Sequence, residues 1–191
     1  MYWFLIPLIF GFSSNLASSF TAEYSSRWGK TNGSLITILL RDITGIPVWA
    51  IGFVLAISES SRMFYRVTTF HRIAGWVIIS IGAVIIIIAL MSIRKKAAAP
   101  STTDALVSRG IYSLVRHPIH SGTLLEFAGL FIIWPSLQVG IACVIGITWI
   151  FLQSHFEESD LLRRIPEYKE YRLKVPAFIP SLRKNRTNQH L

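Results

Sequence analysis

A run of twenty-one uncharged residues, from Ile73 to Ile93, is the feature that most constrains how this chain folds. A helix needs about 20 consecutive apolar residues to cross a bilayer, and this run stops at the basic string 94–96. Only 15% of the residues are charged, against about 25% in ordinary soluble domains. The sequence therefore predicts an integral membrane protein that uses lipid as its main solvent.

Four further apolar segments complete a predicted set of five transmembrane helices and an all-α fold. They are Tyr2 to about Phe20, Leu35–Ile57, Ile119–Trp134 and Leu137–His155. The first lacks the basic start and the clear cleavage site of a secretory signal peptide, so we interpret it as a span. Only Pro135-Ser136 separates the last two segments, and such a short connector predicts an antiparallel helical hairpin over 119–155.

Basic residues are distributed unevenly about these spans. Sixteen of the 19 Lys and Arg residues lie in segments 21–42, 94–118 and 155–191, which five spans would place on one side of the membrane. The positive-inside rule assigns this side, with the C-terminal segment, to the cytoplasm. The net charge of +9 fits this topology and anionic lipid headgroups better than a nucleic-acid partner, because the basic residues alternate with apolar spans.

The length and the cysteine content limit the chemistry that we expect. With 191 residues, the chain has no room for a soluble catalytic domain beside its membrane helices, so a site is expected in or on the membrane part. We expect three spans in residues 1–93 and the chemistry in residues 94–191. The single cysteine, Cys143, lies in an apolar stretch and predicts neither a disulfide nor a cysteine metal site.

The first polar motif begins at Leu106, where the chain reads LVSRGIYSLVRHPIHSG. Gly110 allows a sharp turn, and Pro118 is a favourable first residue of a helix. Arg116 and His117 are therefore expected at the mouth of the fourth span, beside free backbone amides that favour anionic groups. Taken singly, each of these residues is more often a membrane-boundary anchor than a functional group.

The second polar motif follows the fifth span and starts with Glu157 and Glu158. Two carboxylates at the C-terminal end of a helix oppose its dipole, so we expect a compensating charge. Arg163 and Arg164 in the tail are one possible source. Arg116 and His117 across the hairpin, or a cationic ligand, are the other.

Together these motifs resemble the isoprenylcysteine carboxyl methyltransferase family and the related phospholipid methyltransferases. The resemblance runs from about Asp104 to Pro180 and rests on LVxxGxYxxxRHPxxxG, the hairpin, the Glu pair and EYxxYxxxVPxxIP in this order. It implies a pocket for S-adenosylmethionine that the C-terminal segment covers and that opens sideways to lipid. By position, it implies seven cofactor-binding residues: Leu106, Val107, Tyr112, His117, Pro118, His120 and Glu157.

Three charged residues are predicted to take part in catalysis. Arg116 and Glu158 belong to the two motifs, and Glu126 lies roughly 12 Å into the fourth span at 1.5 Å per residue. An ionisable group at this depth is expected to face a cavity, here the acceptor tunnel; a hydrogen bond to a neighbouring helix is the alternative. Tyr168 and Tyr171 either fold back as part of a lid or pack in the core.

Two positions depart from the family pattern. His120 replaces a tyrosine, and Gln153 replaces an arginine that meets the acceptor's carboxylate in isoprenylcysteine enzymes. We therefore expect an S-adenosylmethionine-dependent membrane methyltransferase, without a metal, that acts on a lipid-like or small apolar acceptor rather than on a carboxylate. Two alternatives stay open: a non-enzymatic membrane accessory protein, and an NADPH-dependent reductase related to membrane sterol reductases.

Overall fold

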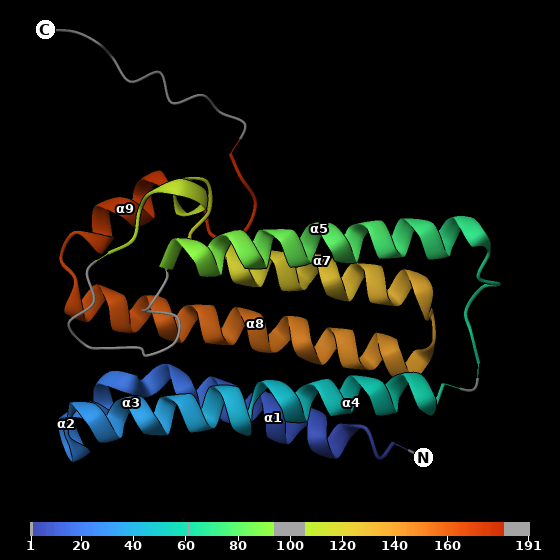
Figure 1. Cartoon of the computed structure of the whole chain (residues 1–191), viewed down its shortest axis with the longest axis horizontal. Helices are drawn as coiled ribbons and strands as arrows, with labels where there is room; N and C mark the ends of the chain where they lie inside the picture. Colours follow the sequence, from blue (N-terminus) through green and yellow to red (C-terminus); the bar gives the residue numbers. More distant parts are fainter. Residues whose placement is uncertain (1, 61, 94–105, 182–191) are drawn as a thin grey trace, which may run out of the picture.

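The computed structural model describes residues 2–60, 62–93 and 106–181, so the basic string 94–96 lies outside the described part. These residues form long helices that run roughly side by side, with short helices gathered at one end (Figure 1). In the described residues the only strand-like pairing is one isolated bridge, between Met63 and Ser136. The predicted all-α class is confirmed.

The order of the helices follows the predicted apolar segments. The first rod joins α1 (Leu5–Ala17), η1 (Ser18–Phe20) and α2 (Thr21–Trp28), and the second joins α3 (Lys30–Ile38), η2 (Leu39–Ile43) and α4 (Ile46–Ser58). The remaining long helices are α5 (Thr69–Ile93), α7 (Pro118–Ile133) and α8 (Leu137–Arg164). Two short elements complete the described chain, η3 (Gly110–Ser113) and α9 (Tyr168–Lys174).

The structure does not confirm the predicted number of five membrane-spanning helices. Four helical stretches in the described residues are long and apolar enough to cross a bilayer: Leu5–Trp28, Lys30–Ser58, Thr69–Ile93 and Leu137–Arg164. The predicted fourth span is α7, which has only 16 residues. At 1.5 Å per residue it is about 24 Å long, against about 30 Å of hydrocarbon, because Pro118 starts it and Pro135 follows its end.

Glycines bring α5 and α7 into close contact along their length. Gly75 faces Gly129 and Gly82 faces Gly122, so that the two pairs lie one heptad apart on each helix. A Cβ added to Gly82 would lie 2.5 Å from the carbonyl oxygen of Gly122. Small residues of this kind allow helices in lipid to pack backbone against backbone, where the hydrophobic effect offers no drive for association.

Helix α8 lies between the α5–α7 pair and the two N-terminal rods (Figure 1). The buried core between these layers is aromatic. Phe12 of α1 stacks on Trp49 of α4 at 5.4 Å, and Phe53 of α4 stacks on Phe127 of α7 at 4.9 Å. The core thus joins the N-terminal rods to the hairpin of α7 and α8.

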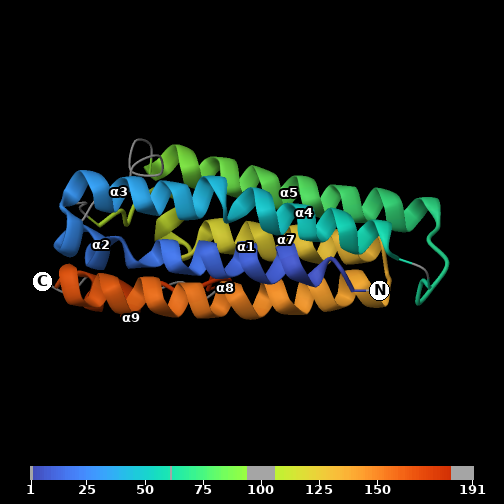
Figure 2. The ribbon, with the colours of Figure 1, turned by 90° about the horizontal axis from the view of Figure 1, so that it is seen from below.

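The helix ends fall into two groups, one at each end of the bundle. The predicted hairpin is present: residues 134–136 connect α7 to α8, and Ser136 caps α8 by accepting from the amide of Val139. At the opposite end lie α2, α3, η3 and α9, as both Figure 1 and Figure 2 show. This second end collects both polar motifs of the sequence.

We expect Gly82→Leu to destabilise the fold by about 1–3 kcal/mol, the usual cost of overpacking, because the new side chain meets backbone rather than a mobile side chain. The buried thiol of Cys143 provides the assay: a thiol-reactive dye follows its exposure during heating in detergent. Val84→Leu, on the exposed face of the same helix, is the control and keeps the wild-type midpoint. Equal midpoints for the two variants would show that the glycine contact contributes nothing.

Candidate functional site: a capped cavity at the polar end

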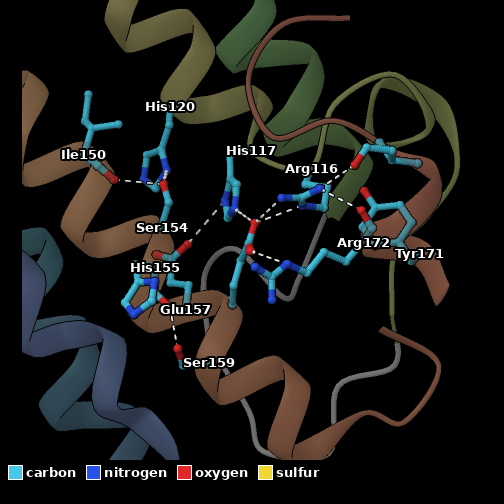
Figure 3. A network of polar contacts seen from close by, with 12 residues as sticks. Arg116, His117, His120, Ile150, Ser154, His155, Glu157, Ser159, Tyr171 and Arg172 are labelled. Atoms are coloured by element: carbon cyan, nitrogen blue, oxygen red, sulfur yellow. Dashed lines mark hydrogen bonds and ion pairs between the residues drawn. The ribbon is translucent and has the colours of Figure 1, made fainter. Parts of the chain in front are cut away.

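The two polar motifs meet because the hairpin returns the chain to the same end of the bundle. Gly110 adopts a φ of 62°, which permits the sharp turn that the sequence predicts before η3. His117 is the N-cap of α7 and Pro118 its first residue. Residues 150–161 of α8 face this start of α7, and α9 with residues 175–178 folds back over both (Figure 3).

The C-terminal segment is bonded directly to the start of α7. The amide of Arg116 donates to the carbonyl oxygen of Pro176 at 2.8 Å, and the amide of His117 donates to that of Ala177 at 2.9 Å. The hydroxyl of Ser121 donates to the carbonyl of Phe178 at 2.7 Å. The C-terminal segment therefore covers the start of α7, and the amides of residues 116 and 117 bond to it.

Glu158 is the buried centre of this end. Its Oε1 accepts from Arg116 Nε at 2.9 Å and lies 2.9 Å from His117 Nε2, while its Oε2 lies 3.2 Å from Arg172 Nε. The side chains of Arg116 and Glu158 are 12% and 11% exposed. A carboxylate this deeply buried is stable only with such partners. The ion pair therefore fixes α7, α8 and α9 relative to one another.

This arrangement decides between the two predicted sources of compensation. Arg116 and His117 meet Glu158, whereas Arg164 pairs with Asp160 at 2.6 Å. The assumption that the Glu pair ends the helix is wrong. Helix α8 continues about two turns past His155 to Arg164, because its end is set by Pro166 and not by the limit of the apolar sequence.

Glu157 points to a different place from its neighbour. Its Oε1 accepts from Gln153 Nε2 at 3.1 Å, and its Oε2 lies 3.8 Å from His117 Nδ1. The ring of His117 stacks on those of His120 and Phe178, with centroids 5.5 and 5.6 Å apart. Glu157 and the two histidines thus form one cluster beside the Glu158 ion pair (Figure 3).

A cavity of about 460 Å³ opens at this cluster. All seven predicted cofactor-binding residues line it, as do Arg116, Gln153, Tyr168 and Tyr171. Glu158 is not among its lining residues, since its carboxylate is engaged in the ion pair. The structure therefore brings the predicted cofactor residues to one space and separates the two members of the Glu pair.

Glu126 is not among the residues that line this cavity, and its place at an acceptor tunnel stays a prediction. It lies on α7 opposite Gly82 of α5, whose added Cβ would be 3.0 Å from Glu126 Cγ.

Tyrosines close the cavity on the side of the cover. Tyr168 and Tyr171 of α9 are both buried, and the hydroxyl of Tyr171 donates to the carbonyl oxygen of Tyr112. Burial, reinforced by the nearby charge of Glu157, raises the pKa of Tyr112 to about 12. Tyr112 therefore stays protonated at neutral pH and presents an aromatic ring and a hydroxyl group.

The opposite wall of the cavity comes from the N-terminal rods, which the sequence motifs did not indicate. Asn15, Ser19 and Trp49 line it together with Trp149 of α8. Asn15 Oδ1, Ser19 Oγ and both indole nitrogens are buried without a hydrogen-bond partner in the described part of the chain. Buried polar groups normally have partners, so these atoms are available for hydrogen bonds to a molecule in the cavity. Arg41, which also lines the cavity, pairs with Asp42 at 2.7 Å.

Comparisons with known proteins identify a family and several relatives. Residues 70–169 match the phospholipid methyltransferase family. The chain is 34% identical over 80 residues to the cobalt-zinc-cadmium resistance protein CzcN of Cupriavidus metallidurans. This aligned stretch covers 41% of this chain and 37% of that protein. It is 32% identical over 82 residues to the methanethiol S-methyltransferase of Pseudomonas deceptionensis. Here the aligned stretch covers 41% of this chain and 30% of the relative.

The matched region is thus only about a third of the length of these relatives, and no solved structure matches. The family match is broader. It starts at α5, includes the glycine-packed pair and the hairpin, and ends in α9. Because it covers more than half of the 191 residues, the chain belongs to the phospholipid methyltransferase family.

Proposed function

We propose that this protein is a membrane methyltransferase that binds S-adenosylmethionine in the capped cavity. The observation that carries the proposal is that all seven residues implied by the family resemblance line one cavity. Its volume of about 460 Å³ lies in the range of cofactor and small-molecule sites. When bound, S-adenosylmethionine supplies a methyl group on a positively charged sulfur, so the reaction requires no metal.

The side chains of the cavity suit this cofactor chemically. Tyr112 offers an aromatic wall for an adenine ring, and Leu106 and Val107 add apolar surface beside it. The cluster of His117, His120 and Glu157 offers acceptors for the hydrogens of an ammonium group, and the carboxylate also favours a nearby sulfonium. The task of the protein is to align two reactants and to exclude water, which the cover over residues 116–121 supports.

We place the methyl acceptor at the wall formed by the N-terminal rods. That wall combines the rings of Phe12 and Trp49 with the uncharged polar atoms of Asn15 and Ser19. Gln153, at the position of the family's carboxylate-binding arginine, is engaged with Glu157. These features favour a lipid-like or small apolar acceptor without a carboxylate. The small thiol named for one relative falls within this class.

We assign Arg116 and Glu158 a positioning role instead of the direct catalytic role expected from sequence. Their charges neutralise each other, and Arg116 Nη1 also donates to the carbonyl oxygens of Arg172 and Val175. They thereby hold the cover on the cavity. We further propose that this end faces the cytoplasm, because sixteen of the 19 Lys and Arg residues belong to its segments.

We expect His117→Ala and Glu157→Gln each to weaken the binding of S-adenosylhomocysteine by about 1–3 kcal/mol, the range for leaving a buried polar partner unpaired. Because both residues contact one ligand, the double variant should lose less than the sum of the single losses. Isothermal titration of the detergent-purified chain measures the affinities. His155→Ala, exposed on α8, is the control and keeps the wild-type affinity.

Titration with NADPH under the same conditions separates the alternatives. Binding of NADPH but not of S-adenosylhomocysteine would support a reductase, and binding of neither would support an accessory protein. Either result contradicts the methyltransferase proposal.

Because Glu158 is proposed to hold the cover in place, we expect Glu158→Gln to weaken the attachment of the cover. The substitution leaves Arg116 and Arg172 without the buried carboxylate, which typically costs about 3–5 kcal/mol. We expect a lower unfolding midpoint and faster proteolysis within residues 175–181. Glu157→Gln, which changes the adjacent carboxylate outside this ion pair, should leave both unchanged. Loss of turnover in Glu158→Gln at wild-type stability and wild-type proteolysis would instead make Glu158 a catalytic residue.

A further inference from the structure

The cluster of His117, His120 and Glu157 has the composition of a metal site. One ligand atom from each of the three residues lies within 4.8 Å of the other two. His117 and His120 come from the start of α7 and Glu157 from α8, and Figure 3 shows the three side chains turned toward one another. Two histidines and one carboxylate are a common protein ligand set for zinc and related ions.

The hydrogen bonds of His120 fix which of its ring nitrogens carries the proton. The hydroxyl of Ser154 donates to the carbonyl oxygen of Ile150 at 2.8 Å, so its oxygen accepts at its second contact, from His120 Nδ1 at 2.8 Å. Nδ1 therefore carries the proton of the neutral ring. Nε2 is left with a free electron pair.

The same reasoning applies to His117. Its Nε2 lies 2.9 Å from Glu158 Oε1, a carboxylate oxygen that already accepts from Arg116 and has no proton to give. Nε2 therefore donates, and Nδ1 carries the electron pair of the neutral ring. Nδ1 is the nitrogen that lies 3.8 Å from Glu157 Oε2. In many metal sites a carboxylate holds the ligating histidine through its other ring nitrogen in this way.

With both rings neutral, each of the three residues offers an electron-pair donor, and one ligand atom of each lies within 4.8 Å of the other two. Such an arrangement attracts a cation or a group with several hydrogens. Ligand atoms about 2.0–2.2 Å from a tetrahedral zinc ion lie roughly 3.3–3.6 Å apart, so the three ligand atoms would move closer together when an ion binds. The adjoining cavity leaves room for a fourth ligand, as in zinc sites that bind water or another small ligand.

We infer that His117, His120 and Glu157 bind one divalent cation of the zinc class, and that this ion excludes the methyl donor from the cavity. The site itself follows from the geometry of the three side chains. The exclusion rests on the proposed function, because the ion and the cofactor would share the same electron pairs. A zinc-class ion is thus expected to act as a competitive inhibitor of the enzyme.

The binding experiment uses the full chain, purified in detergent without a histidine tag and freed of metal with EDTA. Titration with CoCl₂, followed by its visible d–d absorption, and with ZnCl₂, followed by calorimetry, should show one ion per chain. His120→Ala and Glu157→Gln should each weaken binding by at least about tenfold, and Ser154→Ala by about 10–100-fold through the lost support of His120. His71→Ala, His155→Ala and Cys143→Ser should bind as the wild type does.

Competition separates this inference from the proposed function. Saturating S-adenosylhomocysteine should lower the apparent affinity of the chain for zinc. Saturating zinc should lower its apparent affinity for S-adenosylhomocysteine by the same factor. Zinc binding without any binding of S-adenosylhomocysteine would leave the metal site standing and overturn the proposed function. Binding of S-adenosylhomocysteine with no stoichiometric metal, or metal binding that survives His120→Ala and Glu157→Gln, would overturn the metal site. Simultaneous binding of both ligands would overturn the exclusion.

Discussion

The buried ion pair of Glu158 is the interaction on which the polar end of this molecule depends. The Glu158 carboxylate of α8 contacts Arg116 and His117 at the start of α7 and Arg172 of α9. Burying a charge without partners costs free energy, so this ion pair stabilises the contacts between these segments. The adjacent Glu157 is turned by about 100° around α8, which directs its carboxylate to the cavity. Two consecutive acidic residues thereby point to different places, Glu158 into the ion pair and Glu157 to the cavity.

Close helix packing supplies the rigid frame behind this end. The glycine pairs hold α5 against α7, and the short connector at residues 134–136 holds α7 against α8. The aromatic core then joins this unit to the N-terminal rods, which complete the cavity with Asn15 and Trp49. The family match includes α5 but not those rods, so the proposed cofactor residues lie within the match, whereas the rods that form the proposed acceptor wall lie outside it.

Much of the candidate site was predictable from sequence because local rules determine it: Pro118 starts α7, Pro135 bounds the hairpin, and the motif spacing brings the seven expected residues to one cavity. Other features depend on information that local patterns lack. Hydropathy shows where an apolar segment ends, which need not be where its helix ends. The extension of α8 to Arg164 was therefore missed. The contact of Glu126 with Gly82 depends on the packing of α7 against α5, and the N-terminal wall carries no recognisable motif.

Photochemical labelling tests the central claim, that the capped cavity holds the methyl donor, most directly. The purified chain is irradiated with S-adenosylmethionine that carries a radioactive methyl group, and the labelled tryptic peptides are identified by mass spectrometry. The account predicts label in residues 110–116, which include Tyr112, and in residues 117–163, which include His117 and Glu157, and its loss when S-adenosylhomocysteine is added. Label confined to other parts of the chain, or label that S-adenosylhomocysteine does not displace, would contradict it.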